Sequence, residues 1–148
     1  MGTGRLQLTQ RVNAQGATEA FPSTTTDTAT HSACAILPTA DGESRCLPSS
    51  EWLRFSDSSC SPSGAVTTTS PSATTPTIGS RWNGDACGGG LVLHELVPSR
   101  NWPTQIYDAN ILTGCTLDPF GTGGDHQYYV AGAELPLSDF AKVALVTE

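Results

Sequence analysis

Residues 27–42 (DTATHSACAILPTADG) and residues 108–123 (DANILTGCTLDPFGTG) follow one pattern, D-x6-C-x3-P-x3-G, at a spacing of 81 positions. The shared residues are aspartate, cysteine, proline and glycine, which chains use for turns and cross-links. A repeated unit usually buries its apolar face against a neighbouring unit. We therefore expect one domain with a duplicated scaffold, the first repeat over about residues 4–60 and the second over about 85–148.

Short alternating or β-branched runs surround these stretches, whereas helical periodicity is weak. The expected strands are RLQLTQRV (5–12), TEAFPSTTT (18–26), CAIL (34–37), EWLRFSD (51–57), LVLHELV (91–97), WPTQIYDA (102–109), CTL (115–117), HQYYVAGAEL (126–135) and AKVALV (141–146). The Asp41-Gly42 pair predicts a two-residue hairpin, and Ser138 could cap a single helical turn. The fold class is all-β: two similar antiparallel β-meanders that form a sandwich or barrel. Propeller-like blades are the alternative, although two blades could not close a ring.

Residues 61–80 (SPSGAVTTTSPSATTPTIGS) connect the two repeats, and sixteen of the twenty are Ser, Thr, Pro or Gly. This composition is typical of a linker or an O-glycosylated stalk. An exposed edge strand is the third interpretation, with AVTTT paired on one side and prolines preventing further pairing. We favour the edge strand, because the segment must join the two copies.

The composition indicates an exported protein. The chain has 14 acidic and seven basic residues, a net charge of -7, and one lysine. Such a surface repels phosphate backbones, so nucleic acid is not an expected partner. Five cysteines in 148 residues favour an oxidising compartment, outside the cell or on its surface. The opening MGTGRLQLTQ has no basic region followed by an apolar run, so we see no signal peptide, and no apolar stretch has the length of a transmembrane segment.

Two intramolecular disulfides are expected. Cys34 and Cys46 flank the Asp41-Gly42 hairpin, where strand neighbours can reach the Cα separation that a disulfide needs. Cys60 and Cys87 would then bridge the Ser/Thr-rich connection, and Cys115 would be a buried free thiol or form an intermolecular disulfide. No close C-x2-C pair is present, so we expect neither a zinc site nor any other cofactor.

Two groups of residues are candidates for ligand binding. A Gly-Gly-Asp-His turn could present Asp125 and His126 to a metal or substrate, although a polar hairpin tip is the simpler interpretation. The aromatic residues could form a sugar-binding platform, or they could instead fill the ends of the β-structure. This second set comprises Trp82, Trp102, Tyr128 and Tyr129, together with Trp52 and Tyr107. His94 lies in an alternating run and is interpreted as an ordinary strand residue, whereas the aspartates, Asp108 among them, are interpreted as turn residues.

Several stretches resemble a pattern in uncharacterised secreted or lipid-anchored repeat proteins of Gram-negative soil bacteria. They are GTGRLQL (2–8), DTATHSACAILPTADGESRCLP (27–48), FSDSSC (55–60) and YYVAGAELPLSDF (128–140). In that family a DG-x-x-RCLP turn precedes an aromatic strand that ends in a Ser/Ala-Asp-x-x-Cys turn. The resemblance implies location and build but no activity. The second repeat departs from the first, because Gln127 occupies the position equivalent to Cys46.

No convergent set of catalytic residues is visible, so we expect a non-enzymatic extracellular protein. Its predicted role is structural or in surface interaction, as a self-assembling subunit or a partner of other surface proteins. A carbohydrate- or metal-binding module, with a polysaccharide as partner, is the first alternative, and a secreted hydrolase is the second. A specific function is expected in parts that the repeats do not share, namely residues 61–80 or 120–129.

Overall fold

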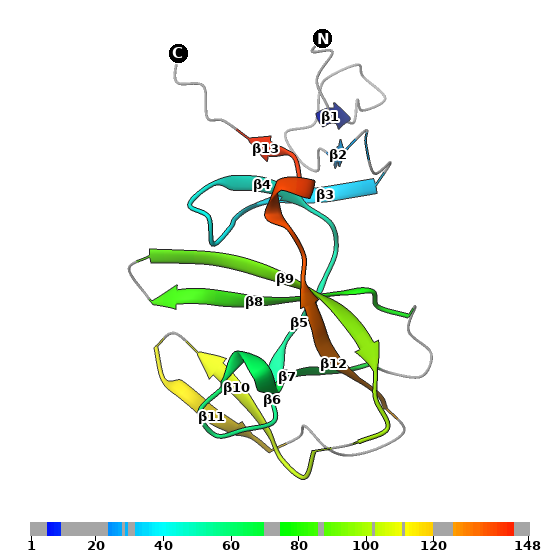
Figure 1. The fold of residues 1–148 in the computed structure, drawn as a ribbon. Helices are drawn as coiled ribbons and strands as arrows, with labels where there is room; N and C mark the ends of the chain where they lie inside the picture. Colours follow the sequence, from blue (N-terminus) through cyan, green and yellow to red (C-terminus); the bar gives the residue numbers. More distant parts are fainter. Residues whose placement is uncertain are drawn as a thin grey trace, which may run out of the picture.

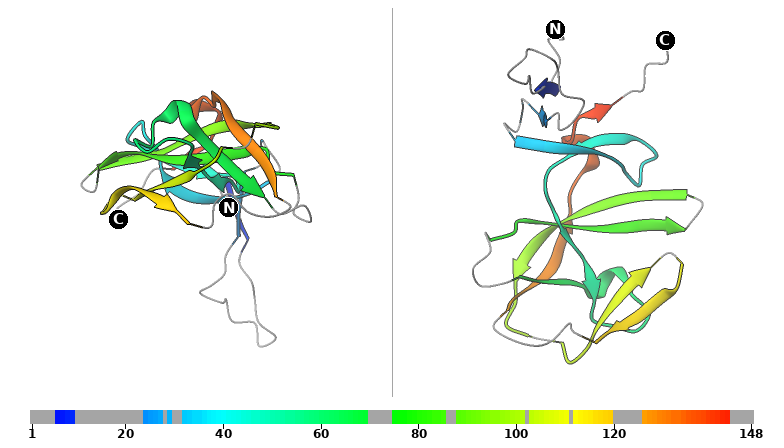
Figure 2. Two further views of the ribbon diagram at one scale, coloured as in Figure 1. Left: turned by 90° about the horizontal axis from the view of Figure 1, so that it is seen from below. Right: turned by 180° about the vertical axis from the view of Figure 1, so that it is seen from behind.

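The computed structural model describes residues 6–9, 24–27, 29, 32–69, 75–85, 88–101, 103–110, 112–119 and 126–143. Within these ranges the chain forms β-strands, turns and two short 3-10 helices, η1 (Pro62–Gly64) and η2 (Leu137–Asp139). The predicted all-β class is therefore confirmed. The strands form two curled sheets, shown in Figure 1 and from two further sides in Figure 2.

The smaller sheet has five antiparallel strands, near the top of Figure 1. Their order is β1 (Leu6–Thr9), β2 (Thr24–Asp27), β3 (Ser32–Pro38), β4 (Ser44–Leu47) and β13 (Lys142–Val143). The end of the chain thus returns to the first half, where β13 pairs with β4. The Cys46 amide donates to the Ala141 carbonyl at 2.9 Å, and the Lys142 ammonium lies 2.7 Å from the Glu43 carboxylate.

The larger sheet has eight strands and one parallel pair, β5 with β8. The strand order is β11 (Gly114–Asp118), β10 (Ile106–Asn110), β6 (Arg54–Phe55), β7 (Ala65–Thr69), β12 (Gln127–Glu134), β9 (Gly88–Pro98), β8 (Ile78–Asp85) and β5 (Glu51–Trp52). The pairing of β12 with β9 shifts register between Ala131 and Glu134. Figure 1 shows the consequence of the curl: the β8–β9 pair lies above the β10–β11 pair.

Two apolar clusters form the core of the described structure. In the first, Leu47 from β4 packs with Leu91 and Leu93 from β9 and with Phe140, so it joins the two sheets. The second combines Leu53, Phe55 and Ala65 inside the curl of the larger sheet. Burying a Leu or Phe side chain contributes roughly 1.5–3 kcal/mol, so both clusters stabilise the fold substantially.

The sheets also touch through backbone at Thr39, which is almost fully buried. Thr39 forms a parallel bridge with Leu91, and the Ala40 amide donates to the Leu91 carbonyl at 3.0 Å. A Cβ atom on Gly90 would lie only 2.2 Å from the Thr39 carbonyl carbon. Glycine at position 90 therefore allows this close approach of the two backbones.

The hairpin between β3 and β4 is real, but its loop has three residues instead of the predicted two. The Thr39 amide donates to the Glu43 carbonyl at 2.8 Å, and Gly42 takes the left-handed conformation (φ 81°). Asp41 accepts a hydrogen bond from the Thr39 hydroxyl and two from Arg45, and these bonds lower its pKa. A type I turn followed by a left-handed glycine explains the extra residue.

The prediction of an exposed edge strand for AVTTT is wrong. These residues form β7, which pairs with β6 on one side and with β12 on the other. Ala65, Val66 and Thr67 are buried. The Ser/Thr-rich composition misled the prediction, because threonine is β-branched and suits a strand inside a sheet as well as one at its edge.

Both copies of the D-x6-C pattern lie on antiparallel strand pairs, but in different sheets. Thr25 pairs with Cys34 in β2–β3, whereas Ala109 pairs with Cys115 in β10–β11, so the registers differ. The predicted final strands correspond to β12 and β13, and the predicted helical turn is η2, with Pro136 rather than Ser138 at its N-cap. Gly123 lies outside the described residues.

Candidate ligand-binding cleft

Two adjoining hollows, of about 210 and 360 Å³, lie between the ends of strands from both halves of the chain. Both are lined by Trp52, Trp82, Ala109 and Asn110, and the larger is also lined by Asp108. We call them together the tryptophan cleft. One wall comes from β5 and β8, and the other comes from the β10–β11 hairpin. A concave surface with aromatic side chains and a few polar groups is the usual form of a small-molecule site.

The two tryptophans are brought together by the parallel pairing of β5 with β8, in which Trp52 lies beside Ser80. Trp52 is 45% exposed, whereas Trp82 is half-buried and packs against the first apolar cluster. Trp82 is thus fixed by the core, and Trp52 offers its ring to solvent.

Two polar atoms of the cleft are buried without a hydrogen-bond partner in the described structure: Trp82 Nε1 and Asp108 Oδ1. Buried polar atoms are almost always paired, and leaving one unpaired costs roughly 1–3 kcal/mol. Trp82 Nε1 can only donate, and an ionised Asp108 can only accept. Both residues line the larger hollow, so side-chain rotation that exposes these atoms would let a bound group that accepts and donates satisfy them.

The hairpin wall is joined to the rest of the protein by few interactions. Strand β10 pairs with β6 at a single position, Tyr107 with Phe55. Arg54 and Asp118 form an ion pair at 2.8 Å. Tyr107 also packs against the second apolar cluster, and Ile106 is buried. A disulfide joins Cys60 to Cys115 with a Cα–Cα distance of 5.7 Å. Both cysteines also line the smaller hollow.

The turn that carries Cys60 is built around Asp57. The Asp57 carboxylate accepts hydrogen bonds from the hydroxyl and amide of both Ser59 and Ser61. These bonds, that from the Ser59 hydroxyl most strongly, lower the Asp57 pKa to about 2. They fix a turn in which Cys60 has left-handed backbone (φ 51°). Position 64 in this turn is glycine, because a Cβ atom there would clash with the Asp57 carboxylate. The FSDSSC motif thus positions one half of the disulfide.

The disulfide predictions are confirmed in one case and wrong in the other. Cys34 and Cys46 are bridged, with a Cα–Cα distance of 5.3 Å. Cys60 pairs with Cys115 and not with Cys87, because the curl of the larger sheet brings β11 to the turn after β6. Cys115 is therefore neither a free thiol nor an intermolecular link. By count the fifth cysteine is Cys87, which lies outside the described residues.

The structure places some residues of the predicted aromatic platform in the interior and others in the tryptophan cleft. Tyr128 and Tyr129 are 4% and 2% exposed, so they belong to the interior, as the alternative interpretation had it. Burial raises the pKa of Tyr128 to about 12. Trp102 lies outside the described residues, and Tyr107 is half-buried. Trp52 and Trp82 are the two members that meet at one surface.

Asp108 was expected in a turn, but it lies in strand β10. Periodicity could not assign it to the cleft, because its position opposite the tryptophans depends on how the hairpin folds back. The only sequence signal was the D-x6-C pattern itself.

His94 is a buried strand residue, as expected, and it positions a residue of the cleft. Arg81 Nε donates to His94 Nε2 at 3.0 Å, and His94 Nδ1 lies 3.1 Å from the Gly132 carbonyl. These contacts fit a neutral imidazole with its proton on Nδ1. The Arg81 side chain, which also lies 3.9 Å from a Glu134 carboxylate oxygen, lines the smaller hollow.

The predicted Asp125–His126 site stays a prediction. His126 is exposed next to β12, and Asp125 lies outside the described residues. Among the described residues, no three His, Cys, Asp or Glu side chains lie close enough together to hold a metal ion.

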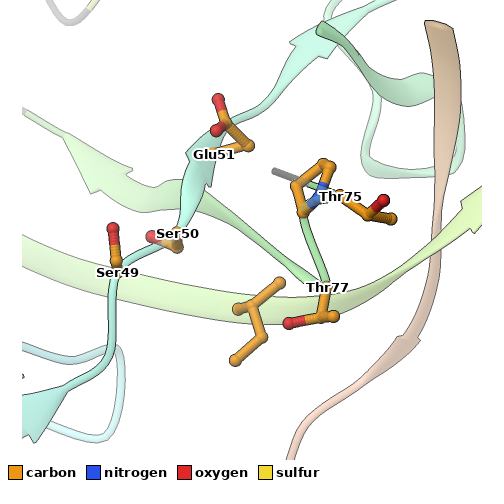
Figure 3. Close-up of a pocket in the computed structure, with 7 residues that line it drawn as sticks. Ser49, Ser50, Glu51, Thr75 and Thr77 are labelled. Atoms are coloured by element: carbon orange, nitrogen blue, oxygen red, sulfur yellow. The ribbon is translucent and has the colours of Figure 1, made fainter. Parts of the chain in front are cut away.

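A third hollow, of about 300 Å³, is drawn in Figure 3. It is lined by residues 49–51, where β5 begins, and by residues 75–78, where the chain enters β8. Its polar lining consists of Ser49, Ser50, Glu51, Thr75 and Thr77. The Ser50 hydroxyl is already bonded to the Ser80 hydroxyl at 2.9 Å. None of the described residues lining it is aromatic, so it offers less binding area than the tryptophan cleft.

The fold and cleft define a small, disulfide-bonded β protein with an aromatic cleft in its described part. The chain belongs to a family of unknown function, DUF7481, whose model matches residues 1–147. Searches of curated proteins and of solved structures each found no match. The two disulfides indicate an oxidising, non-cytoplasmic environment. Across the described ranges, no helix is long and apolar enough to cross a membrane.

Proposed function

We propose that this protein is a non-enzymatic surface-interaction module that binds its partner in the tryptophan cleft. The observation behind this proposal is the pair of unsatisfied buried atoms, Trp82 Nε1 and Asp108 Oδ1, in one hollow beside the exposed ring of Trp52. All three residues line the same hollow, although the two polar atoms themselves are covered. A ligand would satisfy the two polar atoms and cover the ring.

Binding is better supported than hydrolysis. Glycoside hydrolysis commonly needs two carboxylates on either side of the scissile bond. Among the described residues that line the cleft, Asp108 provides the one carboxylate. A nucleophile with an adjacent base would be the other requirement, and His94 is occupied by Arg81 and Gly132.

The proposal includes a location outside the cell or on its surface, where the disulfides would persist. It also includes kinship with secreted or lipid-anchored repeat proteins of Gram-negative soil bacteria, as the RCLP and FSDSSC motifs suggest.

Nuclear magnetic resonance of the three indole N–H groups tests the site. Each signal is assigned by single Trp→Phe substitution, and the intact protein is titrated with three probe classes: methyl glycosides, N-acetyl amino-acid amides and nucleosides. We expect at least one class to shift the Trp52 and Trp82 signals while leaving the methyl signals of Val97 unchanged. Val97 is also 45% exposed but does not line the cleft. If no class shifts either indole signal, the cleft is not a binding site.

Self-association is a second candidate role, favoured by strand β11. It forms one end of the larger sheet, and its Leu117 side chain is 51% exposed. An unpaired strand edge with an exposed leucine can pair with another copy. Size measurement over a wide concentration range would test this, with Leu117→Lys expected to abolish any oligomer. A strictly monomeric protein at all concentrations would refute it.

A further inference from the structure

We infer that the ligand of the tryptophan cleft is a neutral saccharide, with Trp52 as the stacking platform and Trp82 and Asp108 as the hydroxyl-binding pair. This inference rests on the proposed binding function of the cleft and names the chemical class of its ligand.

The first reason is the exposed ring of Trp52. Its π-face carries negative electrostatic potential, and the C–H groups on one face of a sugar ring are weakly positive. A ring of this area at the rim of a hollow, 45% exposed, therefore matches the flat C–H face of a pyranose. Trp82 is held by the first apolar cluster, so the second indole does not need to be ordered on binding.

The second reason is the pairing of one donor with one acceptor. Trp82 Nε1 needs an acceptor, and Asp108 Oδ1 needs a donor. A hydroxyl group is both, so the hydroxyls of a sugar supply a partner of the right kind for each atom once side-chain rotation exposes it. A purely apolar ligand would leave both atoms unsatisfied, and a carboxylate or phosphate could accept from Trp82 but would face the Asp108 carboxylate.

The third reason is charge. The protein carries a net charge of -7, and Asp108 adds local negative charge inside the cleft. Arg81, a cation that lines the smaller hollow, already donates to His94 and lies 3.9 Å from Glu134. An anionic polysaccharide would therefore be repelled both at long range and at the site, which favours a neutral sugar.

The fourth reason is shape. The cleft consists of two adjoining hollows that share Trp52 and Trp82, so it can hold neighbouring units of a chain as well as a single ring. Asn110, which lines both hollows, adds an amide that can donate and accept along the same path.

Affinity gel electrophoresis of the intact, oxidised protein tests the ligand class. The gels contain a neutral polysaccharide (dextran, mannan, galactan, xylan or a β-glucan) or an anionic one (alginate or hyaluronate). We expect retardation by at least one neutral polymer and by neither anionic one. Titration calorimetry with an oligosaccharide of the retarding polymer then gives affinities for the variants.

Trp52→Ala should reduce the affinity tenfold or more, because it removes the platform. Asp108→Asn should reduce it about tenfold, because a neutral amide accepts a weaker hydrogen bond than a carboxylate does. Val97→Ala, at an equally exposed position outside the cleft, should leave it unchanged. Because Trp82 packs against the core, the affinity of Trp82→Phe is interpreted only if its thermal unfolding matches that of wild type. If Trp82→Phe is destabilised, the Trp52→Ala affinity is the deciding measurement.

The saccharide inference would be overturned if no neutral polymer retarded the protein, whether or not an anionic one did. It would also be overturned if a neutral polymer retarded wild type and Trp52→Ala equally. The indole titration separates this failure from failure of the site. If amino-acid amides or nucleosides shift the Trp52 and Trp82 signals while no saccharide binds, the cleft is a binding site for another class. If nothing shifts those signals, both proposals are wrong.

Discussion

Removing the Cys60–Cys115 disulfide should both destabilise the protein and release one wall of the cleft. The bridge closes a loop with a sequence separation of 55 residues. In the chain-entropy model such a loop contributes about 4 kcal/mol, against about 3 kcal/mol for the separation of 12 between Cys34 and Cys46. Since the free energy of unfolding of native proteins is about 5–15 kcal/mol, the Cys60→Ala/Cys115→Ala protein should be marginally stable.

Loss of the Cys60–Cys115 bridge should destabilise the β10–β11 hairpin more than it destabilises the rest of the protein. Without the bridge, the hairpin keeps one ladder position on β6, the ion pair between Arg54 and Asp118, and the apolar packing of Ile106 and Tyr107 at one end of β10. An ion pair this exposed contributes about 0–1 kcal/mol. The Asp108 side of the cleft should therefore open locally more often than the rest of the protein unfolds.

Urea unfolding gives the change in the free energy of unfolding, and amide hydrogen exchange gives the local change. We expect amides of Ile106–Asn110 and Gly114–Asp118 to lose protection selectively in the double variant. Cys34→Ala/Cys46→Ala is the control, since that bridge lies within the smaller sheet and should leave hairpin protection unchanged. Unchanged hairpin protection without the Cys60–Cys115 bridge would refute the idea that this disulfide holds the wall.

Three further outcomes are expected. Gly90→Ala should cost roughly 1–3 kcal/mol in urea unfolding, because its Cβ would meet the Thr39 backbone, whereas Gly88→Ala, with open space around it, should have little effect on packing; equal losses would contradict this. Asp57 has a folded-state pKa of about 2 against 3.8 when unfolded, so its contribution to stability is complete above about pH 4 and fades as pH falls towards 2. Comparing urea midpoints at pH 5 and pH 2.5 should show a smaller drop for Asp57→Asn than for wild type. Absorbance titration should show one tyrosine, absent in Tyr128→Phe, that ionises near pH 12.

The parts of the fold that the sequence predicted correctly depend on neighbours along the chain. The hairpin after β3 follows from Asp41 and Gly42, which stabilise a turn wherever it occurs. The Cys34–Cys46 bridge follows because its ends flank that hairpin. Short runs rich in apolar and aromatic residues likewise predicted β9 and β12, although residues 90–94 of β9 are buried continuously and do not alternate.

The parts that could not be predicted depend on distant pairing. The sequence predicted a bridge from Cys60 to Cys87, which is nearer along the chain, whereas the fold places Cys60 beside Cys115. The meeting of Trp52 and Trp82 depends on a parallel pairing of only two residues in β5, which leaves no pattern in the sequence. The same holds for β7, because composition does not indicate how many of a strand's edges are paired.

The repeat itself gains a different meaning from the structure. Asp27 and Cys34 serve the fold in the first copy: Asp27 is buried and accepts from the Ala29 amide at 2.9 Å, and Cys34 is bridged within its own sheet. The matching Asp108 has an unsatisfied oxygen at the cleft, and Cys115 reaches across the larger sheet to hold that wall in place. Asp108 and Cys115 of the proposed site therefore occupy positions that the copies share, whereas Trp52 and Trp82 do not, and none of its lining residues falls within residues 61–80 or 120–129. Because the two hairpins differ in register and in sheet, the same residue types can stabilise one hairpin and line a binding cleft in the other.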